Sequence, residues 1–102
     1  MKKAAMAVFI SFSMFAFTQV ALAGDAAAGK AKSQACVSCH GMNGKSNNPN
    51  YPNLAGQKKN YLVKAMKAYK SGERKDAMMN SLLAPMSDED IENLAEFFSS
   101  VK

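Results

Sequence analysis

The pattern of apolar and polar positions divides the chain into an apolar leader and a more polar remainder. Apolar residues fill most of positions 4–20. After Gly24 they recur instead at helical spacing, and no segment shows the period of two that marks a half-buried strand. The pattern therefore predicts that the remainder is all-α.

The leader has the order of a signal peptide. Two lysines follow Met1, the apolar stretch comes next, and Ala21-Leu22-Ala23 supplies the small residues of a cleavage site. A stretch of about twenty residues could also span a bilayer as an uncleaved anchor. Polar residues interrupt this stretch, however, and no cluster of charges follows it. We therefore expect residues 1–23 to be removed and residues 24–102 to form the mature domain.

The first half of the mature domain predicts one helix and one long loop. Asp25 can cap a helix from Ala26 to about Ala35, which is rich in alanine. Glycine, asparagine, serine and proline are dense from Cys36 to Gly56, which indicates a long ordered loop. Loops of this length without secondary structure are usually functional.

The second half predicts three helices. Apolar residues at helical spacing indicate an amphipathic helix over residues 58–71 that ends at Gly72. A short helix is expected over residues 77–84. Ser87 then begins a Ser-Asp-Glu-Asp start that resembles a capping box. One face of this last helix is apolar and consists of Ile91, Leu94, Ala95, Phe98 and Val101.

Composition indicates that the mature domain lacks core material. The full chain has 13 Lys+Arg, 8 Asp+Glu and a net charge of +5, of which +3 remains once the leader is removed. Only eleven of the 79 mature residues are Leu, Ile, Val or Phe, about 14%, which lies below the roughly 20% at which a chain starts to look disordered. A chain of this length excludes a multidomain enzyme, and so small a core predicts an apolar component from outside the chain.

The motif that carries chemistry is Cys36-Val37-Ser38-Cys39-His40. Cys-x-x-Cys-His is the attachment signature of haem c: two thiols form thioethers with the vinyl groups and the adjacent imidazole ligates iron. A large apolar macrocycle would also supply the missing core. The motif and the composition thus predict the same cofactor.

Other interpretations of the motif fit less well. A Cys36–Cys39 disulfide would close too short a loop to stabilise much. A thioredoxin-like pair needs a β-α-β context, and zinc needs more ligands than two cysteines and the single histidine, His40. A soft-metal site that binds copper through the cysteines and methionines remains an alternative.

A second iron ligand would have to be a methionine, because His40 is the only histidine. Met42 lies too close to the motif to reach the opposite haem face. Met66 belongs to an apolar helix stripe, and Met86 precedes the Ser87 cap, where a hydrophobic staple is the commoner role. Met78 and Met79 are left, and spacing alone does not choose between them.

These residues together resemble a known family. The sequence is similar to the small monohaem class I cytochromes c of bacteria, and to one half of the dihaem periplasmic type, over essentially all of residues 24–102. The features that carry the likeness are Cys36–His40, Pro52-Asn53-Leu54-Ala55-Gly56, a methionine in a short segment, the Ser87-Asp88-Glu89-Asp90-Ile91 start and Leu94-Ala95-Glu96-Phe97-Phe98.

The resemblance implies a compact fold of three to five short helices around one covalently bound haem. The N- and C-terminal helices would cross at Gly29, opposite Leu94 and Phe97. Cys36 and Cys39 match the thioether cysteines and His40 the proximal ligand, while Pro52 matches the proline whose carbonyl receives the imidazole N–H. Alignment on the Ser87 cap places the distal ligand at Met79, with Met78 as the alternative.

The resemblance also implies one-electron transfer between periplasmic or membrane redox proteins by a monomer that is not an enzyme. Neither nucleic acid nor a small-molecule substrate is expected. Lysines 58, 59, 64, 67 and 70, with Arg74 and Lys75, could form a basic docking face, or simply the solvated side of a helix. Glutamates 89, 92 and 96 would then give an opposite pole. An open iron that acts on peroxide or binds gas, a copper-handling module and a subunit of a larger complex are the alternatives.

Overall fold

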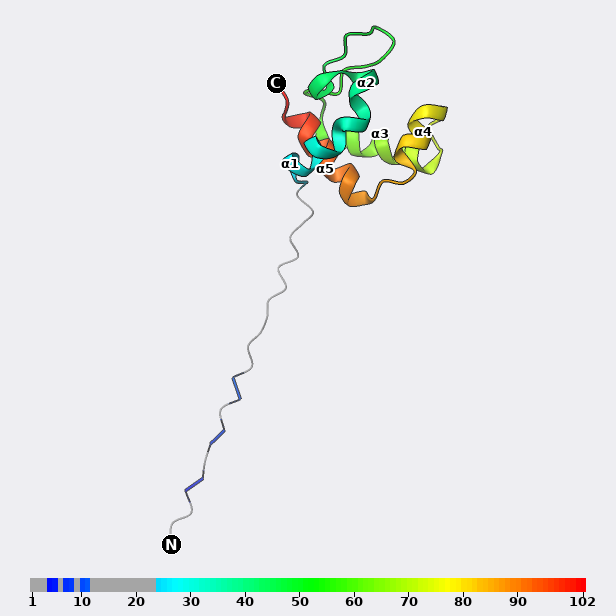
Figure 1. The fold of residues 1–102 in the computed structure, drawn as a ribbon. Coiled ribbons are helices and arrows are strands. Elements are labelled where there is room, and N and C mark those ends of the chain that lie inside the picture. Colours follow the sequence, from blue (N-terminus) through cyan, green and yellow to red (C-terminus); the bar gives the residue numbers. More distant parts are fainter. Residues whose placement is uncertain (1–3, 6, 9, 12–23) are drawn as a thin grey trace.

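The computed structural model describes residues 4–5, 7–8, 10–11 and 24–102. Most of the expected signal peptide, residues 1–23, lies outside these residues. No helix in the described part of the chain is long and apolar enough to cross a membrane. The elements, in chain order, are α1 (Ala26–Lys32), η1 (Ser33–Cys36), α2 (Val37–His40), η2 (Met42–Gly44), α3 (Lys59–Ser71), α4 (Ala77–Leu83) and α5 (Asp88–Ser100) (Figure 1).

Helices α1 and α5 cross, as expected, and Gly29 lies at the crossing. A side-chain carbon on Gly29 would lie 1.9 Å from the backbone oxygen of Asn93 and 2.9 Å from Cβ of Phe97. Only glycine permits so close an approach of two backbones. A hydrogen bond of 2.8 Å from the Asp25 N–H to Asn93 Oδ1 ties the start of α1 to α5. The two ends of the domain are thereby joined.

Helix α5 supplies most of the core. Its capping box is formed as predicted: Ser87 Oγ accepts from Asp90 N at 3.0 Å, and Asp90 Oδ2 accepts from Ser87 N at 3.1 Å. Ile91 and Leu94 are completely buried, and Met86, just before the cap, is buried in the same cluster as Ile91. This arrangement agrees with a hydrophobic staple.

Helices α3 and α4 form the other side of the domain. α3 ends at Gly72, whose φ of 82° is left-handed, and this confirms the predicted stop. Asp76 caps α4 by accepting a hydrogen bond from the Met79 N–H at 3.0 Å. In Figure 1, α4 lies at the far end of α3, away from the crossing of α1 and α5.

The expected loop from Cys36 to Gly56 is wrong in its first part. The chain is helical in α2, breaks at Gly41 and forms the 3₁₀ turn η2 before a longer irregular stretch begins at Lys45. The glycine and asparagine density concealed a single helical turn. That turn has a local purpose, because residues three apart share one side of a helix and Cys36 and Cys39 are three apart.

Candidate haem site

The Cys-x-x-Cys-His motif is built on α2 and the residue before it. Cys36 and Cys39 are half-buried free thiols, and His40 is buried. The chain then turns at Gly41, where φ is 80° and an added side-chain carbon would lie 2.0 Å from the Lys45 oxygen. The turn therefore needs glycine, and it ends the helix directly after His40.

The irregular segment after η2 delivers the Pro52 carbonyl to His40. Nδ1 of His40 lies 2.8 Å from the Pro52 oxygen, the contact that the family resemblance implies. Because a carbonyl can only accept, Nδ1 carries the proton. The segment is held by hydrogen bonds from Ser46 N to Asn53 Oδ1 at 2.7 Å and from Leu54 N to Gly44 O at 2.8 Å.

A cavity of about 330 Å³ opens beside the motif. Its wall is mostly apolar and includes residues from α3, α4 and α5. Cys36, Cys39 and His40 lie in this wall, and so do Met78 and Met79. The fold thus brings every predicted ligand to one enclosed space, although the two groups are about forty residues apart in sequence.

The methionines differ sharply in their positions. Met42 is 65% exposed and does not line the cavity. Met66 and Met86 do line it, within the apolar packing predicted for them. Met78 is 57% exposed, and its Sδ lies 4.0 Å from Sγ of Cys39, whereas Met79 is half-buried and packs against the core.

Burial also affects the first cysteine. It raises the pKa of the Cys36 thiol, and the neighbouring Cys39 raises it further. The neutral thiol is therefore the favoured form of Cys36 at neutral pH. A thiol of this kind differs from the exposed, low-pKa cysteines of thiol–disulfide enzymes, which need a thiolate.

Two polar residues of the cavity wall were not predicted as site residues. Arg74 lines the cavity, and its guanidinium lies 4.7 Å from the centre of the Tyr69 ring. Tyr51 lines it too, and its ring meets that of His40 edge-on at 6.3 Å between centroids. No sequence signal identified either residue, because one lies in a polar loop and the other among surface charges.

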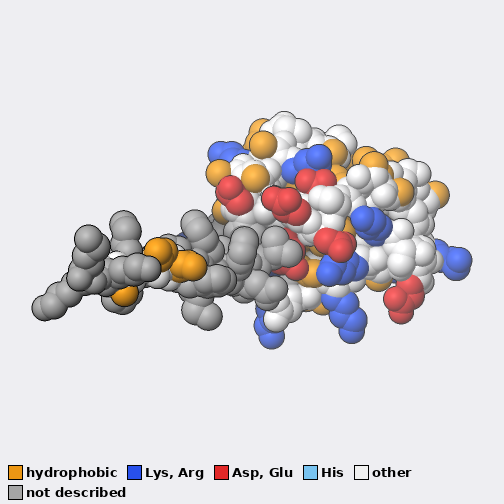
Figure 2. Space-filling view, turned by 90° about the horizontal axis from the view of Figure 1, so that it is seen from below, with side chains coloured by type: hydrophobic (Ala, Val, Ile, Leu, Met, Phe, Trp, Pro, Cys, Tyr) orange, Lys and Arg blue, Asp and Glu red, His pale blue; other side chains and the backbone are white. Residues whose placement is uncertain are grey.

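The basic docking face is smaller than the sequence suggested. Lys59 pairs with Glu96 at 3.0 Å and with Glu92 at 3.7 Å, and Lys70 donates to the Met86 carbonyl. Arg74 belongs to the cavity wall. Figure 2 shows acidic and basic side chains intermixed on the face it presents. Two glutamates of the expected acidic pole, Glu92 and Glu96, therefore lie beside a lysine of the expected basic face, and the exposed lysines of that face with no such contact are Lys58, Lys64, Lys67 and Lys75.

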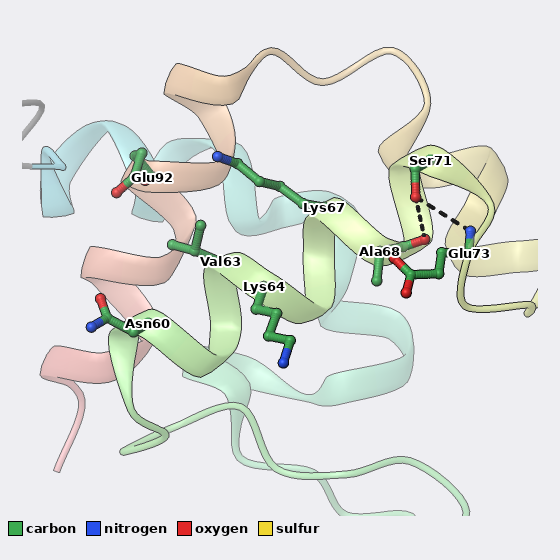
Figure 3. A pocket seen from close by; sticks show the side chains of 8 residues that line it. All are labelled: Asn60, Val63, Lys64, Lys67, Ala68, Ser71, Glu73 and Glu92. Carbon is green, nitrogen blue, oxygen red and sulfur yellow. Dashed lines mark hydrogen bonds between the residues drawn. The ribbon is translucent and has the colours of Figure 1, made fainter.

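The far side of α3 lines a second, open hollow of about 640 Å³ (Figure 3). Val63 and Ala68 line it together with Lys64 and Lys67, whose side chains extend away from each other in Figure 3. Ser71 Oγ donates to the Ala68 oxygen at 3.1 Å. Its lining contains no cysteine, histidine or methionine, so this hollow lacks the thiols and the imidazole of the haem-attachment motif.

The enclosed cavity fits haem c by the chemistry of its donors. Two thiols and an imidazole stand together on one short helix, thioether sulfurs stand on another, and the wall between them is largely apolar. The fold and the site define a small all-α protein built around a covalent haem.

Sequence comparison identifies the family. The Cytochrome c family profile matches residues 26–102, so the chain belongs to the cytochrome c family. This confirms the expected class, fold and cofactor: members of the family hold haem c and transfer electrons.

The chain is similar to proteins of two sizes. Over 80 residues it is 49% identical to cytochrome c4 of Pseudomonas aeruginosa, covering 78% of this chain but 40% of the relative. Over 81 residues it is 48% identical to cytochrome c-554(548) of Halomonas halodenitrificans, covering 76% of this chain and 98% of the relative. The structure of reduced cytochrome c4 from Pseudomonas stutzeri superposes with a TM-score of 0.75 at 44% identity, covering 78% of this chain and 47% of that one. The chain thus spans about two fifths of the cytochrome c4 sequence and nearly all of the shorter relative.

Proposed function

We propose that this chain is a one-electron carrier that holds one haem c through Cys36 and Cys39, with His40 and Met79 as axial ligands of the iron. The supporting observation is that one cavity gathers Cys36, Cys39 and His40 together with the two adjacent methionines. Haem c, when bound, supplies the Fe(III)/Fe(II) couple. The residues of this chain hold, orient and enclose it.

His40 is oriented for ligation by its second nitrogen. The Pro52 oxygen accepts a hydrogen bond from Nδ1 at 2.8 Å, so the other ring nitrogen, Nε2, is the one left to bind a metal. Such a contact fixes the ring and raises the basicity of the ligand. Pro52 is therefore proposed as a positioning residue that acts through its backbone.

Met79 is favoured over Met78 by burial. Its side chain already packs against the core, whereas Met78 is 57% exposed. A thioether ligand stabilises ferrous iron and raises the reduction potential relative to ligation by two nitrogens. With both axial positions filled by protein, no position remains for a substrate, so we propose a carrier and not an enzyme.

Spectroscopy of the haem-loaded protein tests these assignments. We expect the ferric wild type to show the weak long-wavelength sulfur-to-iron band and the ferrous wild type to bind carbon monoxide only slowly. Met79→Ala should lose the band and bind carbon monoxide, while Met78→Ala serves as the matched control and should resemble wild type. Rapid binding of carbon monoxide by the wild type would reject the carrier and favour an open iron site.

We further propose that residues 1–23 are a cleaved signal peptide and that residues 24–102 act in the periplasm. The family match begins at residue 26, which supports a boundary near Gly24. Export would also bring the thiols to the compartment where covalent haem attachment is expected. Mass spectrometry of the haem-containing product tests this: the polypeptide should begin at Gly24, and a product that begins at Met1 would contradict it.

The proposed partners are redox proteins with acidic surfaces. We propose that the carrier binds them as a free monomer. Lys58, Lys64, Lys67 and Lys75 remain available for electrostatic steering. Oxidation by ferricyanide, a small anion, should slow as salt increases and should slow further in a Lys64→Glu, Lys67→Glu double variant. The oxidation rate of the matched Lys64→Gln, Lys67→Gln variant should lie between the rates of wild type and of the glutamate variant. Equal rates in all three proteins would remove this face from the proposal.

A further inference from the structure

Asn80, the residue after Met79, binds three backbone groups with one side chain. Its Nδ2 donates to the Tyr69 oxygen at 2.7 Å and to the Arg74 oxygen at 2.9 Å. Its Oδ1 accepts from the Asp76 N–H at 3.0 Å. These partners belong to the last turn of α3, the turn that follows it and the residue just before α4. One amide therefore uses both donor hydrogens and its acceptor to join the two helices.

Asp76 completes the same unit from the other direction. Its carboxylate accepts from the Met79 N–H at 3.0 Å, and its backbone oxygen accepts from the Asn80 N–H at 2.8 Å. Asp76 and Asn80 thus bond to each other in both directions, and Met79 is held between them. We call this unit, Asp76 and Asn80 with their five hydrogen bonds, the Asp76–Asn80 clamp.

The clamp matters because α4 is too short to fix itself. A helix of seven residues is not stable alone, so its position depends on such anchors. Adjacent residues of an α-helix point about 100° apart, since one turn takes 3.6 residues. The rotation of α4 therefore decides which of two adjacent methionines turns inward, and the observed rotation leaves Met78 57% exposed and packs Met79 against the core.

We infer that the Asp76–Asn80 clamp selects the distal ligand: it fixes the rotation of α4 so that Met79, and not Met78, supplies the sulfur. This inference rests on the proposed ligation by Met79. Asn80 and Asp76 are positioning residues, because they act on the choice of methionine through α4, although Asp76 also borders the cavity. Without the clamp, α4 can rotate and the two methionines compete for one position.

The test uses the full haem-loaded protein and counts the ligand states. In ferrous protein, proton NMR resolves the methyl resonance of an iron-bound methionine, and wild type should show one. Asn80→Ala should show two, with carbon monoxide binding faster by about tenfold, the factor that about 1.4 kcal/mol represents. Asn60→Ala, an exposed asparagine on the far side of α3, is the matched control and should keep one resonance and the wild-type rate.

Two further variants separate selection from simple loss of structure. Adding Met78→Ala to Asn80→Ala should restore a single resonance, although Met78→Ala alone changes nothing. Asp76→Asn keeps an acceptor for the Met79 N–H and should behave as wild type. Asp76→Ala removes that acceptor and should give two resonances, so it replaces Asn80→Ala as the test variant if Asn80→Ala does not retain haem. One resonance in both alanine variants, with unchanged carbon monoxide binding, would overturn the clamp. A Met79→Ala variant that still resembles wild type would instead overturn the ligand assignment itself.

Discussion

The imidazole of His40 is fixed by a backbone atom of Pro52, since Nδ1 lies 2.8 Å from that residue's carbonyl oxygen. The contact crosses from the buried end of α2 to an exposed segment without helix or strand. A buried histidine is thus oriented by a loop. The loop is held by internal hydrogen bonds, such as the one from Ser46 N to Asn53 Oδ1, and by bonds to the rest of the domain, such as the one from Gly56 N to Phe98 O at 2.9 Å.

Pro52→Ala should lower stability without changing the ligands of iron. Alanine keeps the carbonyl oxygen that meets His40, so low-spin ligation should persist. Loss of the fixed proline φ increases the entropy of the unfolded chain and costs about 0.5–1 kcal/mol. Thermal unfolding and the ferric spectrum check the two halves of this prediction. Loss of the sulfur-to-iron band in Pro52→Ala would show that the ring of Pro52, and not its carbonyl, sets the site.

The sequence predicted the helices well where local signals are strong. The Ser87 cap, the Gly72 stop and the apolar stripe of α5 each carry a local physical signal, and the structure confirms all three. The helical turn at Cys36–His40 was missed because glycine, serine and asparagine surround it.

The sequence predicted the chemical groups that attach the haem, but not the other residues around the cavity. The Cys-x-x-Cys-His spacing identifies haem attachment directly, whereas the contacts of Arg74, Tyr51 and Asn80 arise only when the chain folds. The charge pattern misled for a similar reason. The sequence suggests that Lys59 and Lys70 are solvated. In the structure Lys59 pairs with Glu96 of α5, and Lys70 donates to the carbonyl of Met86, just before α5.

Gly29→Ala should destabilise the domain through the crossing of α1 and α5. The new carbon would lie 1.9 Å from the Asn93 oxygen, so the helices must separate. Overpacking of this kind costs about 3 kcal/mol. Denaturant unfolding of the haem-loaded protein measures it, and Ala31→Ser, an exposed change in the same helix, should cost well under 1 kcal/mol. Equal stability of the two variants would mean that the crossing is not tightly packed.

Lys59→Ala should have a small, salt-dependent effect. The hydrogen bond to Glu96 is the main reason that the pKa of Lys59 is raised from its ordinary value of 10.5. The pair therefore stabilises the fold below pH 10.5, and this stabilisation is lost as pH rises through the raised pKa. At neutral pH and low salt the melting temperature should fall by a few degrees, and in 1 M salt the difference should vanish. Lys64→Ala, an exposed lysine on the same helix, is the control. A difference that persists in high salt would indicate lost packing instead of lost charge.

Asp90 makes the start of α5 sensitive to acid. The hydrogen bond from the Ser87 N–H is the main reason that the pKa of Asp90 is lowered from its ordinary value of 3.8, and Lys32 at 3.5 Å adds to it. A lowered pKa gives stability that is fully present above pH 3.8 and is lost as pH falls through the lower value in the folded protein.

Asp90→Asn should therefore flatten the acid side of the stability curve, because asparagine cannot titrate but can still accept the Ser87 N–H. Ser87→Ala removes the other half of the box and should cost about 1 kcal/mol at neutral pH. Denaturant unfolding between pH 3 and pH 7 distinguishes these effects. Wild type and Asp90→Asn should converge as the carboxylate becomes protonated, and parallel curves would assign the acid sensitivity to another carboxylate. Asp88→Asn, exposed in the same first turn, is the matched control for the change in net charge.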